Sequence, residues 1–479
     1  MDFLQTRGKE IITEHGIATH LRGICVGGWL NFEDFINAYP GTETGIRGHI
    51  KQVLGEKKGE LFFDQMTDHF FTENDIAFLA QTGINCVRLP LSIRHFESDD
   101  KPFVYKQRAF DRLDAVLDLC EQYHIYAILD LHSAPGWQNC HWHSDNERGA
   151  ALLWRHPYFQ ERVIKFWAEM ARHYADRSVV AGYELLNEPS TGNPNGEHSF
   201  DFYKNYHSDW DAINHLYQRI TTAIRAIDSR HIIFLEGDNY GRGFAGLDEP
   251  FADNLVYSSH NYTNPGFGPG AYPGYYGGIY WDKNRHRLEL ETHEGYQYAQ
   301  KYNVPLLIGE FGSQYHGTAE DIPSRLQSMR DQIDVYNEAG LNWTSWTYKD
   351  AGIMGLVTLN PESEYMRIVE PVQEMKRQLG AENFVAQYWD SPGRNKTHEL
   401  ARLILDTAQY TDLTVDDTAF TLNYAALTGF TAAMLQPAYA KRFANVTDAD
   451  IERIMQAFAF DYCNINHAYV EILQSIFGN

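Results

Sequence analysis

Two glutamates at the ends of short apolar runs have the residue type and the setting for acid–base chemistry. Glu188 ends "YELLNE" just before Pro189, and Glu310 lies in "LLIGEFG". A carboxylate at the end of a buried strand loses hydration, and this cost must be offset by a charged or hydrogen-bonding partner or accepted for a function. Two carboxylates beside one bound molecule are what cleavage of a glycosidic bond requires, since one protonates the leaving oxygen while the other attacks or shields the anomeric carbon.

Other apolar runs end in polar or aromatic side chains in the same way. These residues are Arg88, Asp130, His132, Asn187, Glu236, His260, Tyr262 and Trp346. In a barrel of parallel strands the carboxyl ends of the strands meet at one rim, where catalytic residues gather. The shared position of these side chains therefore predicts one site.

Each of these residues also has an ordinary interpretation. A glutamate after an apolar strand can simply begin a polar loop. Arg88 can serve as a structural ion-pair partner, although a buried arginine needs a carboxylate in either case. Glu236 and Asp130 also end apolar runs, so residue type alone leaves either of them as an alternative acid or nucleophile.

The segment "CHWHSDN" brings Cys140, His141, His143 and Asp145 together after the third apolar run. Four potential ligands in six residues suggest zinc, but they lack the split spacing of zinc sites. Sugar-lining roles for His143 and Trp142 are favoured over a metal, and no cofactor is expected.

Tryptophan is a candidate for stacking on sugar rings, because an aromatic face suits the apolar face of a sugar. The chain has 10 Trp, and aromatic residues make up 14% of it. Trp29, Trp137, Trp142 and Trp281 lie near the apolar runs, and each can equally fill the core. We expect two of the four to touch sugar, with Trp29, Trp137 and Trp142 as the candidates.

Short β-branched runs that alternate with amphipathic stretches must position these residues. The runs span 20–26, 84–91, 125–132, 180–188, 231–237, 254–262, 304–311 and 342–348. Helical patterns such as 109–124 and 158–176 separate most of them. Near-continuous apolar strands between helices indicate a parallel sheet covered on both faces. The prediction is an α/β fold, a (β/α)₈ TIM barrel with a helical C-terminal extension.

Two long segments follow strands and would lie at the carboxyl rim. Residues 262–281 are rich in Gly, Pro and Tyr, which predicts neither helix nor strand. Residues 27–60 are polar with scattered aromatics.

The pattern changes near residue 381, after which we expect helices without strands. Leu400, Leu403 and Ile404 keep helical spacing, and Thr447 with Asp450 forms a capping-box pattern. We therefore assign 1–380 to a catalytic barrel and 381–479 to a helical extension packed on it. An oligomer formed through these helices is the alternative use of the extension.

Composition limits the function classes. The net charge of −24 disfavours nucleic acid and anionic membranes and suits a neutral substrate. No run approaches the roughly 18 apolar residues of a membrane span, and the first residues lack a signal-peptide pattern. Five scattered cysteines indicate reduced thiols, so a cytoplasmic protein is expected.

Over about residues 18–350 the ordered set resembles glycoside hydrolase family 5, a group of retaining (β/α)₈ glycosidases with catalytic glutamates on strands four and seven. The matching residues are Arg88, His132, Asn187-Glu188-Pro189, His260-Asn261-Tyr262, Glu310 in "IGEFG" and Trp346 in "TSWTY". The opening "RGICVGGWLNFEDF" (22–35) resembles the start of an exo-acting branch.

The resemblance implies roles for the two glutamates. Glu188 would be the general acid/base and Glu310 the nucleophile, and Asn187 would bond the 2-hydroxyl of the sugar. The acid must stay protonated while the nucleophile is ionised, so their surroundings should separate their pKa values.

The resemblance also implies roles for the residues around the glutamates. Arg88 and Tyr262 would orient the nucleophile and lower its pKa, since a cation and a hydroxyl donor both favour a carboxylate. His132 and His260 would line the cleavage subsite, and Trp346 would form its floor.

The functional expectation is a retaining exo-β-glycosidase acting on short oligosaccharides. Within it we favour a β-mannosidase on a Manβ1-4GlcNAc-type substrate, because the opening resembles an intracellular branch of that kind. The alternative is an exo-β-glucosidase or β-glucanase. A non-catalytic sugar-binding barrel is the alternative from another class, and it would require one of the two carboxylates to be missing or displaced.

Overall fold

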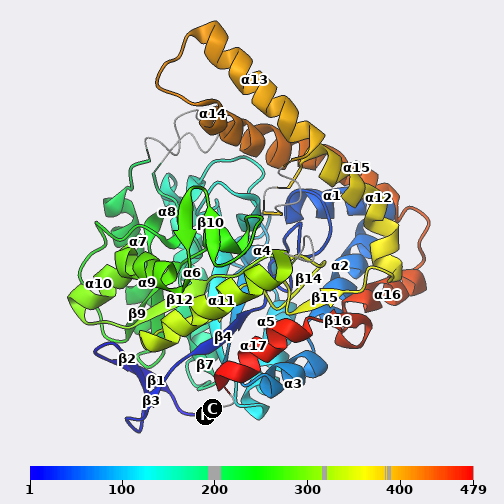
Figure 1. Ribbon diagram of the computed structural model, residues 1–479. Helices are drawn as coiled ribbons and strands as arrows, with labels where there is room; N and C mark the ends of the chain where they lie inside the picture. Colours follow the sequence, from blue (N-terminus) through cyan, green and yellow to red (C-terminus); the bar gives the residue numbers. More distant parts are fainter. Residues whose placement is uncertain (193–205, 316–320, 383, 386–389, 478–479) are drawn as a thin grey trace.

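A closed barrel of parallel strands forms the centre of the protein (Figure 1). The computed structural model describes residues 1–192, 206–315, 321–382, 384–385 and 390–477. The barrel strands are β4 (Arg22–Cys25), β5 (Cys86–Ser92), β6 (Tyr126–Ser133), β7 (Val180–Glu184), β8 (Ile232–Glu236), β9 (Leu255–His260), β12 (Leu306–Glu310) and β13 (Asn342–Ser345). They pair in this order, and β13 returns to β4, so all eight predicted barrel strands are confirmed.

The barrel strands are almost entirely buried, which explains their continuous apolar pattern. Every residue of β5, β7, β8, β9, β12 and β13 is buried. A parallel strand covered on both faces has no polar alternation to display. Because all pairings are parallel, the carboxyl ends of the strands share one rim.

Helices cover the outside of the barrel. They are α1 (Glu43–Leu54), α2 (Glu56–Phe70), α3 (Glu73–Gln81), α4 (Ile93–Phe96), α5 (Gln107–Gln122), α6 (Pro157–Tyr174), α7 (Trp210–Arg225), α8 (Asp238–Gly241), α9 (Lys283–Thr292), α10 (Glu294–Tyr302), α11 (Asp321–Glu338) and α12 (Glu364–Leu379). The predicted helices at 109–124 and 158–176 are α5 and α6, each with one buried apolar stripe.

A small N-terminal sheet closes the end of the barrel away from the rim. Strands β1 (Leu4–Arg7), β2 (Glu10–Thr13) and β3 (Ala18–Thr19) pair in antiparallel fashion. Leu4 and Ile11 pack with barrel residues such as Ile128 and Phe234. This sheet was not predicted from the sequence.

The structure corrects the reading of residues 262–281. This segment contains the 3₁₀ turn η3 (Asn264–Gly266) and a hairpin of β10 (Gly274–Tyr276) and β11 (Ile279–Trp281). Gly277 and Gly278 both have positive φ, which two-residue hairpin turns require. In the other long segment, 27–60, α1 begins at the cap Thr42, whose side chain accepts from the Gly45 amide.

The C-terminal extension is helical apart from one short strand. Its elements are α13 (Pro392–Ala408), α14 (Val415–Leu422), the π-helix η5 (Asn423–Thr431), α15 (Ala432–Lys441), α16 (Asp448–Met455), η6 (Gln456–Phe458), η7 (Phe460–Tyr462), β16 (Cys463–Ile465) and α17 (His467–Phe477). The capping box of Thr447 and Asp450 is present. β16 pairs with β15 (Val357–Leu359), which also pairs with β14 (Lys349–Asp350), so the prediction of no strands after 381 is wrong.

The extension shares the core of the barrel. Tyr439, Phe458 and Tyr469 belong to the same hydrophobic cluster as Ile24 and Trp343. The Tyr469 hydroxyl lies 2.5 Å from the hydroxyl of Ser345, a barrel-strand residue. The division at residue 380 stays a prediction. Within the described part of the chain, no helix has the length and hydropathy needed to cross a bilayer.

Candidate active site

Arg88 of β5 organises the rim of the barrel. Its side chain is fully buried and touches carboxylates from three other strands. Nε donates to Glu184 Oε2 at 2.6 Å and Nη1 to Glu310 Oε1 at 2.8 Å, while Nη2 lies 3.1 Å from Asp130 Oδ2. Nη2 also donates to Asn187 Oδ1 at 2.7 Å. A buried guanidinium is tolerable only when its donors are satisfied in this way.

Glu310, the last residue of β12, is held on both carboxylate oxygens. Oε1 accepts from Arg88, and Oε2 accepts from the Tyr262 hydroxyl at 2.8 Å. His260 Nδ1 lies 3.6 Å from Oε2. These contacts fix the carboxylate in one orientation at the floor of the pocket described below.

Glu188 lies beyond the end of β7 in a left-handed backbone conformation, with φ of 47°. Such a conformation is strained for a residue other than glycine and is common at functional sites. Its amide donates to Glu236 Oε2 at 2.8 Å, and its carboxylate lies 2.8 Å from His260 Nδ1 and 3.2 Å from His143 Nε2. The backbone strain and these contacts aim the side chain across the pocket.

The two glutamates face each other at close range. One carboxylate oxygen from each of Glu188 and Glu310, together with a ring nitrogen of His260, lie within 4.8 Å of one another. Retaining glycosidases hold their carboxyl groups about 5 Å apart, whereas inverting enzymes need about 6.5–9.5 Å. The same three atoms could also hold a cation. Among the described residues, the loop from Cys140 to Asp145 does not form such a group.

His132 and Trp346 form a stacked pair beside Asn187. Their rings are 5.5 Å apart with an interplanar angle of 9°. His132 Nδ1 lies 2.7 Å from Asp130 Oδ2, and its Nε2 lies 3.3 Å from Asn187 Nδ2. Gly27 permits this arrangement, since a Cβ there would come within 2.7 Å of the Trp346 ring.

Burial governs the pKa values in the site. Desolvation lowers the pKa of His260 to about 4 and lowers the pKa values of His132 and His143 well below the usual value, so these imidazoles are neutral at pH 7. Desolvation also raises the pKa of Glu310 to about 7, against the opposing effects of Arg88 and the Tyr262 hydroxyl. The expectation of a lowered pKa for Glu310 is therefore wrong, because burial outweighs the two partners.

These residues line one cavity of about 190 Å³. The side chains that line it are Glu33, Phe35, His132, His141, Trp142, His143, Glu188, Tyr240, Tyr262, Glu310, Trp346, Phe384 and Tyr424. Seven of the predicted site residues line this cavity: His132, Trp142, His143, Glu188, Tyr262, Glu310 and Trp346. Arg88 contacts Glu310, His260 contacts Glu188, and Asn187 accepts a hydrogen bond from Arg88.

Several lining or supporting residues were missed. Glu184 interrupts an apolar strand, and that acidic residue inside a buried run was the available signal for a partner of Arg88. Glu33 lies in "NFEDF", and burial raises its pKa well above the usual value. Phe384 and Tyr424 come from the C-terminal extension, and no local pattern points to them.

Two predicted sugar-binding tryptophans lie elsewhere, which corrects both assignments. Trp29 is buried in the core against Phe71, at a ring distance of 5.8 Å. Trp137 lines a separate cavity, and its indole donates to the backbone oxygen of Asp145 at 2.8 Å. Trp281 packs in a small cluster with Tyr272. Of the four candidates, only Trp142 lines the cavity of the glutamates.

Comparison with known proteins agrees with this geometry. Residues 47–352 match the model of the cellulase family, glycosyl hydrolase family 5. The chain belongs to this family. The enzyme is 34% identical to a beta-xylosidase of Phanerodontia chrysosporium, across 97% of this chain and 96% of the relative. It is 26% identical to endoglucanase C of Acetivibrio thermocellus, across 60% of this chain and 87% of that protein.

The solved structures agree on the fold. A crystal structure described as a glycoside hydrolase matches with a TM-score of 0.50 at 20% identity, over 70% of this chain and 90% of that one. The enzyme is thus a glycoside hydrolase with a (β/α)₈ barrel, and the match to the beta-xylosidase takes in most of the C-terminal extension.

Proposed function

We propose that the enzyme is a retaining exo-β-glycosidase with Glu188 as general acid/base and Glu310 as nucleophile. One observation carries this proposal: the carboxylate oxygens of Glu188 and Glu310 lie within 4.8 Å of each other in one lined cavity. That spacing suits a double displacement. An inverting enzyme needs room for a water molecule between the carboxylate and the sugar, and this spacing leaves none.

In the first step Glu310 forms a bond to the anomeric carbon while the bond to the leaving oxygen breaks. Glu188 gives its proton to that oxygen, and the aglycone departs. In the second step Glu188 takes a proton from water, which attacks the anomeric carbon and releases Glu310. Arg88 and the Tyr262 hydroxyl stabilise the charge that returns to Glu310.

Replacement of the nucleophile tests this assignment. Glu310→Gly should lose turnover of an aryl β-glycoside and regain it with azide, yielding a glycosyl azide of inverted configuration. Glu236→Gly is the matched control, because this glutamate also ends a barrel strand but does not line the cavity. Azide rescue of the control instead of Glu310→Gly would move the nucleophile. Loss of activity in chelator would favour a metal hydrolase.

Exo action is supported by the residues that line the sides of the cavity. Residues from the loop after β4 and from the extension, among them Phe35, Phe384 and Tyr424, surround the glutamates. An exo enzyme releases one sugar at a time. Rapid loss of viscosity from a long β-glucan or mannan, with mid-chain products, would contradict exo action.

The sugar in the cleavage subsite is the finer part of the proposal. The resemblance to an intracellular exo branch favours β-mannosides, and the name of the full-length relative favours β-xylosides. We rank β-xylosides first, β-glucosides second and β-mannosides third, because that relative matches across the extension as well as the barrel. Aryl β-xyloside, β-glucoside and β-mannoside, compared by kcat/KM, decide the order. A clear preference for the mannoside would restore the first prediction.

Location and self-association also remain proposals. None of the five cysteines, all of which lie in the described residues, forms a disulfide, and this fits the predicted reducing, cytoplasmic environment. On α13, Leu400 and Leu403 are 45% and 62% exposed, which supports an oligomer through the C-terminal helices. Light scattering of the wild type and of Leu403→Glu measures this. A monomer at all concentrations would exclude the oligomer.

A further inference from the structure

The C-terminal extension reaches the cavity that holds the two glutamates. Phe384, in the segment between α12 and α13, and Tyr424, in η5, line this cavity together with His141 and Tyr240 of the barrel loops. If the extension packed only on the outer surface of the barrel, barrel residues alone would line the cavity. Here the cavity is incomplete without the last part of the chain.

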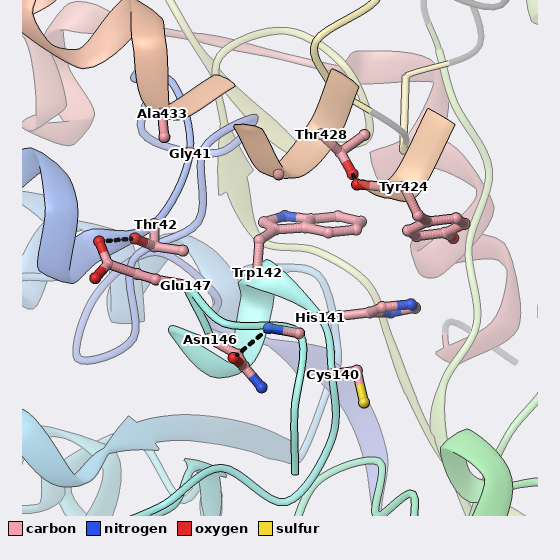
Figure 2. Close-up of a pocket in the computed structure, with 12 residues that line it drawn as sticks. Gly41, Thr42, Cys140, His141, Trp142, Asn146, Glu147, Tyr424, Thr428 and Ala433 are labelled. Atoms are coloured by element: carbon pink, nitrogen blue, oxygen red, sulfur yellow. Dashed lines mark hydrogen bonds between the residues drawn. The ribbon is translucent and has the colours of Figure 1, made fainter. Parts of the chain in front are cut away.

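Tyr424 takes part in a three-layer stack. The His141 ring lies 4.5 Å from Tyr240 at an interplanar angle of 21°, and 4.9 Å from Tyr424 at 7°. Trp142 lies beside the stack, 5.4 Å from His141. Figure 2 shows Tyr424 and Thr428 on the helix opposite His141 and Trp142 on the loop after β6. Offset aromatic stacking stabilises such an arrangement beyond simple burial.

The stack is attached to the acid/base side of the cavity. Asn139, two residues before His141, donates from Nδ2 to the backbone oxygen of Glu188 at 3.0 Å. The Tyr240 amide donates to the backbone oxygen of Pro189 at 3.1 Å. The residue that protonates the leaving oxygen must lie beside the leaving group. The stack therefore borders the space into which the aglycone departs.

Fixed contacts hold the extension in place over this side. Gln436 of α15 donates to the backbone oxygens of Pro40 and Thr42, at 3.2 and 3.4 Å. The Thr42 hydroxyl donates to Glu147 at 3.0 Å, which links the loops after β4 and β6.

A second group of contacts holds the extension on the opposite wall. Phe384 packs against Phe35 and Tyr262, at ring distances of 5.2 and 5.6 Å. The aromatic wall is thus anchored on both flanks of the cavity.

We propose that Tyr424 is a specificity-determining residue. Together with His141 and Tyr240 it borders the leaving-group side of the cavity. There it selects compact leaving groups that carry a ring. The chemistry it favours is an apolar ring face, supplied either by a single sugar or by an aryl group. The same wall obstructs a continuing polysaccharide chain. This inference rests on the proposed roles of Glu188 and Glu310.

Leaving groups of different size test the proposal. Tyr424→Ala should lower kcat/KM for a disaccharide and for the aryl glycoside of the same sugar about tenfold, chiefly through KM. Hydrolysis of the corresponding glycosyl fluoride should stay within about twofold, because a single-atom leaving group makes no contact with the wall. The factor of ten corresponds to about 1.4 kcal/mol of lost contact. Whichever ring-bearing substrate loses more identifies sugar or aryl as the preferred group.

Two variants control for general damage. Phe430 lies in the same π-helix as Tyr424, and its side chain is 69% exposed. Phe430→Ala should therefore leave kcat/KM for all three substrates unchanged. Tyr424→Phe keeps the stacking ring and should retain most of the specificity.

Distinct outcomes would overturn the inference or its foundation. An equal loss of kcat/KM on the fluoride, the aryl glycoside and the disaccharide would contradict the proposed role of Tyr424 but not the roles of Glu188 and Glu310. So would a shift in the alkaline limb of the pH profile, because Tyr424 would then act by displacing Glu188. Absence of turnover by the wild type on all three substrates would instead remove the proposed function.

Discussion

At the scale of residues, the site balances burial against partners. Arg88 contacts Glu184, Glu310 and Asp130 in a fully buried position, yet desolvation still raises the pKa of Glu310 to about 7. The proposed nucleophile must be ionised, and Glu310 is ionised only above its pKa. The free enzyme should therefore lose kcat/KM as the pH falls through about 7.

Tyr262→Phe should move this acidic limb. The hydroxyl donates to Glu310 and favours the ionised form, so its removal raises the pKa of Glu310 and shifts the limb to higher pH. A hydrogen bond to a charged group contributes about 1.5–3 kcal/mol, which corresponds to a shift of roughly one unit or more. The pH profile of kcat/KM measures it, with the exposed Tyr280→Phe as the control. An unmoved or acid-shifted limb would contradict the assigned role of Tyr262.

Glu236 gives a second prediction about protonation. Burial, with Glu184 nearby, raises its pKa well above the usual value and favours the protonated carboxyl. Its Oε2 accepts from the Glu188 amide and its Oε1 lies 3.2 Å from His260 Nε2. Glutamine reproduces one acceptor and one donor, so Glu236→Gln should keep kcat within about threefold.

Glu236→Ala should lower kcat about tenfold or more, since loss of a buried partner costs about 1–3 kcal/mol. Steady-state kinetics of both variants measure this contrast. A glutamine variant as impaired as the alanine variant would show that Glu236 acts as a carboxylate.

At the scale of elements, the loop after each strand decides which way a strand-end residue points. Glu188 leaves β7 with a positive φ, and Gly27 leaves β4 without a side chain, so that Trp346 can lie against it. Strand order alone brings these residues to one rim. Local backbone geometry then turns them into the cavity.

Gly27→Ala should displace Trp346 and reduce activity. The added Cβ would lie 2.7 Å from the indole ring and 2.9 Å from Ile36, so a neighbour must move. Overpacking of this kind costs about 1–3 kcal/mol. Thermal unfolding and kcat/KM measure both effects. Gly48→Ala in α1 is the control, because a Cβ there meets nothing within 4 Å. Wild-type activity with Gly27→Ala would show that Trp346 is not needed.

At the scale of the whole molecule, the extension and the barrel share one core. Phe477 of α17 packs against Trp343 of β13, and Lys349 of β14 bonds the backbone oxygens of Phe70 and Phe458. Lys349 also pairs with Asp75 at 2.6 Å, and both side chains are fully buried. Removal of one partner would leave an unpaired buried charge.

Truncation after residue 380 should therefore give a chain that does not fold into an active enzyme. It would expose the barrel surface beneath Tyr439 and Tyr469 and would leave β15 without β16. Circular dichroism and activity of the 1–380 fragment, compared with the full chain, measure this. A soluble, cooperatively folded and active fragment would support the division at residue 380 and would remove the extension from the site.

The barrel and most of the residues at its rim could be predicted from the sequence. Apolar runs between amphipathic helices predict parallel strands, because burial on both faces leaves a continuous apolar pattern. Once strand order is known, Arg88, His132, Glu188 and Glu310 must meet, since parallel strands end at the same rim. The small N-terminal sheet and the Gly277–Gly278 hairpin had weaker local signals, which were missed or misread.

The full lining of the cavity could not be predicted from the sequence, because it depends on tertiary packing. Trp29 packs in the core and Trp137 lines another cavity. Phe384 and Tyr424, which belong to the C-terminal extension, line the cavity of the two glutamates. Local periodicity reports whether a residue is buried, but not against which distant segment. The pKa of Glu310 has the same origin, because the desolvation that raises it depends on every element packed around the rim.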